Sequence, residues 1–272
     1  MTALIRPFIT LTTDFGLSDH FVGTMKGVII NINPAVKIID ISHQISPQNI
    51  EEAAFVLECA YKYFPPYTIH VVVVDPEVGS SRKPLLVVGG RYYFIAPDNG
   101  TLSFLFNNEE EQVKVIEINA EHYFLESPGF TFHGRDIFAP VAAWLSKGID
   151  VNNFGVETSN YIRRDLPKPE TFGTDLIRGK VIHIDKFGNL ISNIKRSHID
   201  ELVARTGKGK FEIHIKKTKI EGINQFYAQG ERGKPNAVIN SNGYIEIYCY
   251  MGNAREELKA AKGEDVGVVI KK

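Results

Sequence analysis

The feature that most constrains the fold is an apolar run at residues 69–74, which is interrupted only by His70 and ends in four consecutive valines. A strand with one face in water alternates apolar and polar side chains, whereas a strand covered on both faces is apolar throughout. The run therefore predicts a buried strand in a mainly parallel sheet with helices on both faces. The surrounding chain agrees, because strand and helix signals alternate through the first half.

The predicted helices of the first half carry start and stop signals. Ser18 is placed as the N-cap of a helix that runs to Ile32, and Ser46 as the N-cap of a helix with Pro47 in its first position. A third helix is predicted at residues 136–147, ending at Gly148. The strands predicted around these helices lie at residues 8–13, 36–41, 85–88, 92–96 and 113–118.

The second half has a different texture. Its predicted strands are short and separated by Gly and Asn, a pattern typical of a small antiparallel barrel. They lie at residues 180–184, 190–194, 211–215, 237–240, 244–250 and 265–270. The stiff Leu-Pro-Lys-Pro segment that begins at Leu166 marks the change. We therefore expect an α/β fold with an N-terminal domain at residues 1–165, a linker at 166–174 and a smaller C-terminal antiparallel β-barrel domain at 175–272.

The formal net charge of −1 is the sum of two opposed halves. Residues 1–165 hold 12 Lys and Arg against 19 Asp and Glu, a balance of −7, which leaves 19 basic against 13 acidic residues, or +6, for residues 166–272. Such asymmetry is informative where the total is not. An acidic first half suits a cationic ligand.

Several classes of protein and site are excluded. No apolar run approaches the roughly 20 residues that cross a bilayer, and the N-terminal residues hold no stretch of signal-peptide length, so we expect a cytoplasmic protein with no membrane partner. Cys59 and Cys249 are too few for a disulfide framework, and the eight histidines show no metal-ligand spacing, so no metal site is predicted. No glycine loop for a dinucleotide or phosphate occurs, and the Asp-Phe-Gly string at residues 14–16 lacks the other kinase motifs.

Three aspartates are predicted beyond the carboxyl ends of strands, where open parallel sheets bind their ligands. Asp14 follows the first strand, Asp40 the second and Asp75 the valine-rich strand. Each has a structural alternative as a turn former or helix cap, and Asp40 has no further support. His133 lies in a polar loop at the entrance to a helix, where a catalytic and a structural role both remain open.

Two features of the second half also have structural alternatives. The Asp-Lys-Phe-Gly-Asn segment at residues 185–189 links two strands, and Gly-Asn is ordinary turn chemistry. Residues 205–219 hold six Lys and Arg side chains, which is a conceivable nucleic-acid face. Apolar residues alternate with polar ones at 211–215, however. This favours a strand with one solvated face, and we expect no nucleic-acid partner.

Four segments, taken in order, make the chain similar to a known family. They are residues 12–27, with Thr-Thr-Asp-Phe-Gly and Met-Lys-Gly; 75–82, with Asp-Pro, Gly and Arg; 131–140, Thr-Phe-His-Gly-Arg-Asp-Ile-Phe-Ala-Pro; and 185–190, Asp-Lys-Phe-Gly-Asn-Leu. From about residue 8 to about residue 270, the chain resembles the adenosine-forming S-adenosyl-L-methionine hydrolases. These are also called S-adenosylmethionine hydroxide adenosyltransferases and are relatives of the fluorinating and chlorinating enzymes.

The resemblance implies a fold, an assembly and residue roles. The fold is an N-terminal α/β domain with a C-terminal β-barrel domain, and the assembly is a homotrimer with substrate sites between subunits. In such a trimer the acidic half of one subunit would face the basic half of the next, which favours the pairing. Asp75, Arg82 and His133 correspond to the family's water-activating trio, and Asp14 to the acid that accepts the ribose hydroxyls. The positions that correspond less closely to other substrate-binding groups are Asp19, Asp185, Phe187, Asn189, Ser241, Asn253 and Ala254.

The implied reaction is hydrolysis of S-adenosyl-L-methionine to adenosine and L-methionine, with no cofactor. The sulfonium is already a good leaving group, so positioning of water and exclusion of bulk solvent supply most of the gain. Which member of the trio is the general base stays open, because coupled groups share their titration. The alternatives are a halogenase acting on the same substrate and a module that binds S-adenosylmethionine or adenosine without turnover. Against the halogenase, those relatives lack the trio, and a carboxylate beside the reacting carbon repels a halide.

Overall fold

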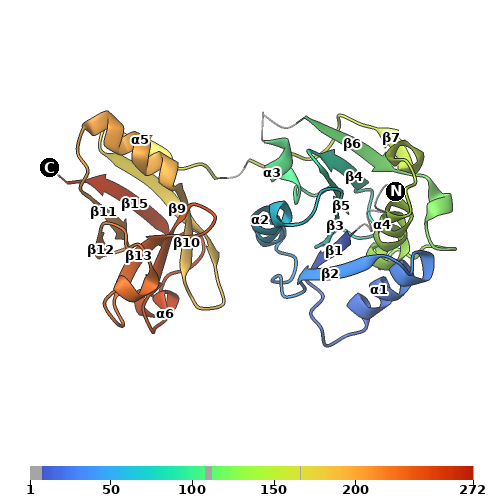
Figure 1. Ribbon diagram of the computed structural model, residues 1–272, viewed down its shortest axis with the longest axis horizontal. Helices are drawn as coiled ribbons and strands as arrows, with labels where there is room; N and C mark the ends of the chain where they lie inside the picture. The colour runs from blue at the N-terminus through green and yellow to red at the C-terminus, as the bar shows by residue number, and fades with distance from the viewer. Residues whose placement is uncertain (1–7, 108–111, 166, 272) are drawn as a thin grey trace, which may run out of the picture. The chain divides into compact units, whose positions relative to one another are not determined.

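The computed structural model describes residues 8–107, 112–165 and 167–271. The chain forms two compact units, Met1–Asp165 and Leu166–Lys272, each of which is built around its own sheet (Figure 1). None of the helices in the described residues is both long and apolar enough to cross a membrane.

The first unit contains a seven-stranded sheet in the order β2-β1-β3-β5-β4-β6-β7. Its strands are β1 (Phe8–Thr13), β2 (Lys37–Ser42), β3 (Ile69–Val73), β4 (Pro84–Gly89), β5 (Tyr92–Pro97), β6 (Val113–Ile118) and β7 (Gly155–Glu157). The pairs among β2, β1, β3 and β5 are parallel, whereas β4, β6 and β7 pair antiparallel. The predicted α/β class is confirmed, with an antiparallel extension at one side.

The valine-rich run forms β3, which lies between β1 and β5 with every residue buried. Helices cover both faces of the sheet, which is why this strand can be apolar throughout. On one face α1 (Phe21–Ile32) and α4 (Ala139–Ser146) pack together, and on the other lies α2 (Ile50–Ala60), next to α3 (Ser103–Phe106) (Figure 1). Residues such as Leu11, Met25 and Phe138 fill the core with the strand valines.

The first two of the three predicted helices begin later than predicted. Helix α1 begins at Phe21 rather than near Ser18. Helix α2 begins at Ile50, with Asn49 as its N-cap, whose side chain accepts a hydrogen bond from the Glu52 N–H at 3.1 Å. Gln48 takes a left-handed φ of 64°, so the chain cannot run helically from Pro47, and Asn49 supplies the cap instead.

The helix predicted at residues 136–147 begins with a π-helical turn instead of a regular α-helical one. Gly134–Phe138 forms a π-helical turn, in which the Ala139 N–H donates to the Gly134 carbonyl, and α4 continues from it to Ser146. Such turns are rare and occur mostly at functional sites. This one follows His133 directly.

The second unit is an eight-stranded antiparallel sheet that nearly closes into a barrel, since its end strands β12 and β13 contact each other. Its strands are β8 (Glu170–Phe172), β9 (Leu176–Ile184), β10 (Leu190–Lys195), β11 (Phe211–Ile215), β12 (Thr218–Glu221), β13 (Pro235–Ile239), β14 (Tyr244–Cys249) and β15 (Asp265–Ile270). The helices are α5 (Arg196–Thr206) and α6 (Ala254–Leu258). The prediction of a β-barrel in this half is confirmed.

Four elements of this unit, β8, β12, α5 and α6, were not predicted. Residues 170–172, predicted as linker, form β8 and pair with β9, because the chain turns back at Gly173, which has a φ of 58°. Helix α5 was not predicted, although its buried Ile199 and Leu202 have helical spacing. In β11, Ile213 and Ile215 are buried and alternate with less buried residues, as expected for a half-solvated strand.

Candidate active site

Two candidate aspartates lie at one edge of the first sheet. Strands β1 and β3 are parallel, and Thr13 is level with Val73 in their register. Asp14 therefore leaves β1 close to the point where Asp75 follows β3. Asp40, by contrast, lies within β2, where its carboxylate contacts the Lys26 ammonium at 2.6 Å and His43 at 3.0 Å. Its predicted place beyond the strand end is therefore wrong, and Asp40 acts neither as a turn former nor as a helix cap but as a partner of Lys26 and His43.

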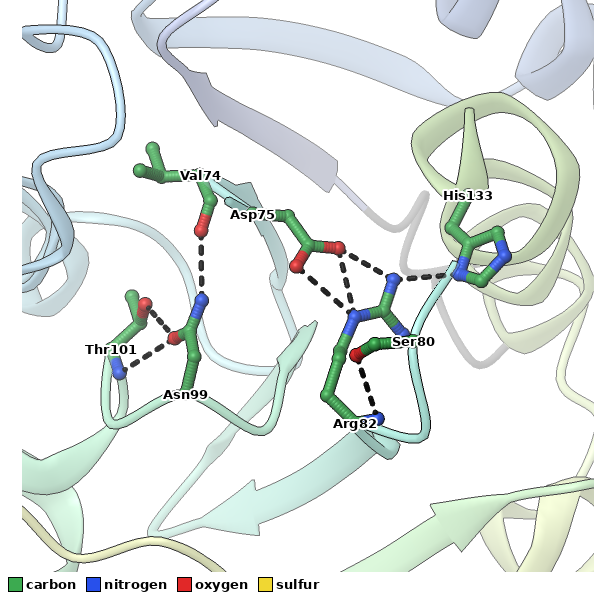
Figure 2. Close-up of polar contacts among 7 residues, drawn as sticks. All are labelled: Val74, Asp75, Ser80, Arg82, Asn99, Thr101 and His133. Carbon is green, nitrogen blue, oxygen red and sulfur yellow. Dashed lines mark hydrogen bonds and ion pairs between the residues drawn. The ribbon is translucent and has the colours of Figure 1, made fainter. Parts of the chain in front are cut away.

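Asp75 is joined to Arg82 by a buried ion pair (Figure 2). The Arg82 Nε donates to Asp75 Oδ1 at 3.1 Å and to Oδ2 at 2.9 Å, and Nη2 donates to Oδ2 as well. The two side chains are only 3% and 4% exposed. A bidentate pair of this kind fixes both the distance and the plane of the two groups.

Arg82 also holds His133, which comes from a loop 51 residues away in the chain. The Arg82 Nη2 donates to the His133 Nδ1 at 2.6 Å (Figure 2). A guanidinium has no acceptor atom, so Nδ1 must offer its lone pair, and the ring is neutral with its proton on Nε2. The pKa of His133 agrees, since burial lowers it and the Arg82 charge lowers it further, against opposing effects of Asp75 and Asp136.

The His133 loop is fixed by contacts on both of its sides. The carboxylate of the buried Asp136 accepts a hydrogen bond from the Gly129 N–H at 2.9 Å. Gly79, between Asp75 and Arg82, has a φ of 82°, and a Cβ there would lie 2.2 Å from the Phe130 carbonyl oxygen. Only glycine therefore permits the two loops to meet this closely.

A pocket of about 140 Å³ lies beside this trio. Its lining is largely apolar and includes Phe15, Phe21, Val73, Asp75, Val78, Thr131, Phe132, His133 and Gly134. The three phenylalanine rings contact one another at centroid distances of 5.3–5.7 Å. A largely apolar wall excludes bulk water and strengthens the electrostatic effects of the charged groups. These rings were not predicted as site residues, although Phe15 and Phe132 are next to Asp14 and His133 in the chain.

The first-unit binding candidates differ in how firmly they are held. Asp14 Oδ2 accepts a hydrogen bond from the Gln48 N–H at 2.8 Å. This bond fixes the carboxylate against the residue that precedes the N-cap of α2. Asp19 is exposed in the loop before α1.

The second-unit candidates lie mostly at one end of the barrel, in and beside the 185–189 turn. Asp185 Oδ1 accepts from the backbone N–H groups of Phe187 and Asn189, both at 2.9 Å, and Oδ2 accepts from the Asn189 side chain at 2.9 Å. The Phe187 ring is 73% exposed. These contacts are the turn chemistry expected from the sequence, and they also present an aromatic ring to solvent.

The start of α6 contacts this turn. The Arg255 N–H donates to the Gly188 carbonyl at 2.9 Å, and a Cβ on Gly188 would lie 2.0 Å from the Asn253 side-chain oxygen. Asn253 and the buried Ala254 are thus brought next to the turn. Ser241 is not, because it precedes β14, whereas Asn253 follows it.

The described residues contain no group of three or more His, Cys, Asp or Glu side chains that could hold a metal ion. The first-unit site itself offers a buried carboxylate, a guanidinium and a neutral imidazole. Such a set can position a water molecule and accept its proton.

Comparison with known proteins identifies the family. Residues 9–155 match the model of the SAM hydroxide adenosyltransferase N-terminal domain, and residues 179–267 match that of the C-terminal domain. The chain belongs to the SAM hydroxide adenosyltransferase family. The family inferred from the four sequence segments is thereby confirmed.

Several relatives match over nearly the whole chain. This member of the SAM hydroxide adenosyltransferase family is 38% identical to a protein of Methanocaldococcus jannaschii named (R)-S-adenosyl-L-methionine hydrolase, over 97% of each chain. It is 26% identical to a fluorinase of Actinoplanes sp., over 91% of this chain and 92% of that one. A solved structure from Thermotoga maritima, described as an uncharacterized conserved protein, superimposes with a TM-score of 0.87 at 33% identity, covering 96% of this chain and 99% of that one.

Proposed function

We propose that this protein is an enzyme that hydrolyses S-adenosyl-L-methionine to adenosine and L-methionine, by in-line attack of water on the ribose C5′. One observation carries the proposal: the buried Asp75–Arg82 pair and His133 form a connected trio beside a largely apolar pocket. The curated name of the Methanocaldococcus jannaschii relative, which matches over 97% of each chain, supports the same reaction.

The proposed mechanism follows from the donors and acceptors of the trio. With Nδ1 engaged by Arg82, the neutral His133 offers its Nε2–H to the oxygen of the water and orients it. The water oxygen bonds to C5′, the C5′–S bond breaks, and its electron pair turns the sulfonium into the thioether of methionine. Asp75 is the carboxylate of the trio and accepts the proton that the water loses, while Arg82 keeps that carboxylate in place.

Substrate binding is proposed for the remaining candidates. The Asp14 carboxylate, oriented by Gln48, accepts the ribose hydroxyls, and Asp19 contributes on the methionine side. The exposed ring of Phe187 stacks on adenine. Aromatic groups prefer an offset or edge-to-face contact, and we expect one of these geometries here. The other proposed contacts come from Asp185, Asn189, Ser241, Asn253 and Ala254.

We extend the proposal to the assembly and the cellular location, on the basis of the sequence resemblance and the composition. The chain has two functional domains, at residues 1–165 and 175–272. Three chains form a cytoplasmic homotrimer, in which the barrel domain of one subunit completes the substrate site of its neighbour. No cofactor is needed, because the sulfonium is itself the leaving group.

A halogenase is the second candidate, since a fluorinase is among the relatives. The buried Asp75 argues against it, because a carboxylate in the site raises the energy of a nearby halide. Incubation with S-adenosyl-L-methionine in ¹⁸O-water, followed by chromatography and mass spectrometry, separates the candidates. Hydrolysis gives adenosine with ¹⁸O on C5′ and methionine, whereas halogenation in chloride or fluoride gives a 5′-halo-adenosine.

The matched control for this assay is Asp75→Asn, which keeps the size of the side chain. If the wild-type protein binds the substrate tightly but forms no product, hydrolysis is contradicted. The alternative of a module that binds without turnover would then be favoured. Product that forms equally with Asp75→Asn would exclude the proposed role of the trio.

A further inference from the structure

The turn at residues 97–101 lies between the two strands that deliver the ion pair. Strand β5, which leads into this turn, pairs with β3 on one side and with β4 on the other. Because β5 is parallel to β3 and antiparallel to β4, its end, the exit of β3 and the start of β4 share one edge. Asp75 follows β3 and Arg82 precedes β4, so the turn is next to both.

Asn99 in this turn holds the backbone that carries Asp75. Its Nδ2 donates to the Val74 carbonyl at 2.8 Å, and that carbonyl belongs to the peptide bond between Val74 and Asp75 (Figure 2). Asn99 is only 1% exposed. Its contact is therefore made in a dry environment, where an unpaired carbonyl is costly.

Thr101 determines which way the Asn99 amide points. The Asn99 Oδ1 accepts from the Thr101 N–H at 3.2 Å and from the Thr101 hydroxyl at 2.6 Å (Figure 2). Two donors on the same side of the amide require the oxygen there, so the NH₂ group must face Val74.

The same turn is bonded to the chain beyond Arg82. The Asp98 N–H donates to the Lys83 carbonyl at 2.8 Å, and the Asp98 carboxylate accepts from the Ile162 N–H at 2.8 Å. Gly100 makes the turn possible, with a φ of 94°. The turn thus contacts the backbone directly before Asp75 and directly after Arg82.

We propose that Asn99 is a positioning residue for Asp75 and that Thr101 is the residue that orients it. This inference rests on the proposed function. In that mechanism Asn99 contacts neither the substrate nor the attacking water. The Asn99 amide fixes the Val74–Asp75 peptide, and through it the carboxylate that accepts the proton. Loss of this contact lowers kcat, while KM changes little, because the groups that bind ribose and adenine are elsewhere.

Asn99→Asp is the most direct test, because it keeps the size of the side chain and replaces the donating NH₂ by a carboxylate oxygen that faces the Val74 carbonyl. We expect kcat to fall about 10- to 100-fold, since small displacements of a reacting group have effects of this size, with KM within about threefold of wild type. Thr101→Val should lower kcat less, and Thr101→Ser, which keeps the hydroxyl, should restore it.

Asn33→Asp is the matched control in the same unit. The Asn33 Nδ2 donates to the Ser146 hydroxyl at 2.8 Å, between the ends of α1 and α4. This variant should lose some stability in thermal unfolding and keep kcat. An Asn99→Asp protein with the kcat of wild type, or a kcat loss equal to that of Asn33→Asp, would overturn the inference.

A readout that does not require turnover separates this inference from the proposed function. The ¹⁵N NMR signal of the Arg82 Nε–H should exchange slowly with water in wild type and in Thr101→Ser, and faster in Asn99→Asp and Thr101→Val. If wild type forms no adenosine, the proposed function fails and this exchange rate decides the inference. If Asn99→Asp does not fold, the pair Thr101→Val and Thr101→Ser decides it, and equal exchange in those two variants refutes it.

Discussion

The trio in the first unit and the 185–189 turn in the second are built in opposite ways. Arg82 reaches His133 across 51 residues of chain and is 3% exposed, whereas Asp185 bonds to residues only two and four positions away, and Phe187 is 73% exposed. The first is a dry arrangement that depends on the whole sheet. The second is a local turn that presents a ring to solvent. The difference predicts effects on kcat in the first region and on KM in the second.

The largest effect is expected from Asp75→Asn. The variant keeps the shape of the side chain but loses the proposed proton acceptor, so kcat should fall by about 10²- to 10⁴-fold. Steady-state kinetics with a chromatographic assay measures this change. Asp40→Asn is the control, because Asp40 is in a half-exposed pair with Lys26, and such pairs contribute at most about 1 kcal/mol. Equal losses in both variants would remove the distinction between the two aspartates.

Two glycine substitutions compare the regions directly. In Gly79→Ala the new Cβ would meet the Phe130 carbonyl at 2.2 Å, and in Gly188→Ala it would meet Asn253 at 2.0 Å. Both glycines have left-handed φ angles. Gly79→Ala should separate the loops of the trio and lower kcat about 100-fold. Gly188→Ala should distort the turn that presents Phe187 to solvent and raise KM. A rise in KM for Gly79→Ala with kcat unchanged would contradict this comparison.

The pH dependence of kcat tests the neutral state of His133. Its pKa is lowered below 6.5 by burial and by Arg82. Activity should therefore be constant near neutral pH and fall, with a midpoint below 6.5, as protonation of Nδ1 breaks the bond from Arg82. His133→Asn keeps an acceptor near that position, so its lower activity should not show this transition. A midpoint above 6.5 would mean that the charged ring is the favoured form.

The same shift affects stability. In the unfolded state the pKa of His133 is near 6.5, so the unfolded state binds the proton first as the pH falls. The free energy of unfolding therefore decreases between about pH 6.5 and the lowered pKa of the folded state. The free energy of unfolding should vary less with pH in His133→Asn over this range, which denaturant titrations at several pH values measure.

The smallest effect is expected from Phe187→Leu. An aromatic stacking contact contributes about 0.5–1.5 kcal/mol, so KM should rise about 2- to 10-fold with kcat and thermal stability unchanged. Phe226→Leu, on another ring that is 54% exposed, is the control. A fall in kcat without a change in KM would show that Phe187 does not act in binding.

Much of the fold is predictable because it depends on local pattern. The continuous apolar run at β3 requires cover on both faces, and the sheet supplies it with helices on each side. Helix starts were less predictable, since Pro47 looks like a first helical residue until the left-handed Gln48 moves the cap to Asn49. The same holds for β8, which exists only because β9 offers it an edge.

The sequence by itself determined the fold class, the family and the identity of Asp75, Arg82 and His133 as candidates, because apolar periodicity and ordered motifs are properties of the chain. Only the tertiary structure decided how these residues are arranged. It joined the Asp75 carboxylate to Arg82, left the His133 proton on Nε2 and placed Asn99 behind Asp75. Hydrogen bonds between residues far apart in the chain depend on the register of strands and the path of loops, and no local pattern records either.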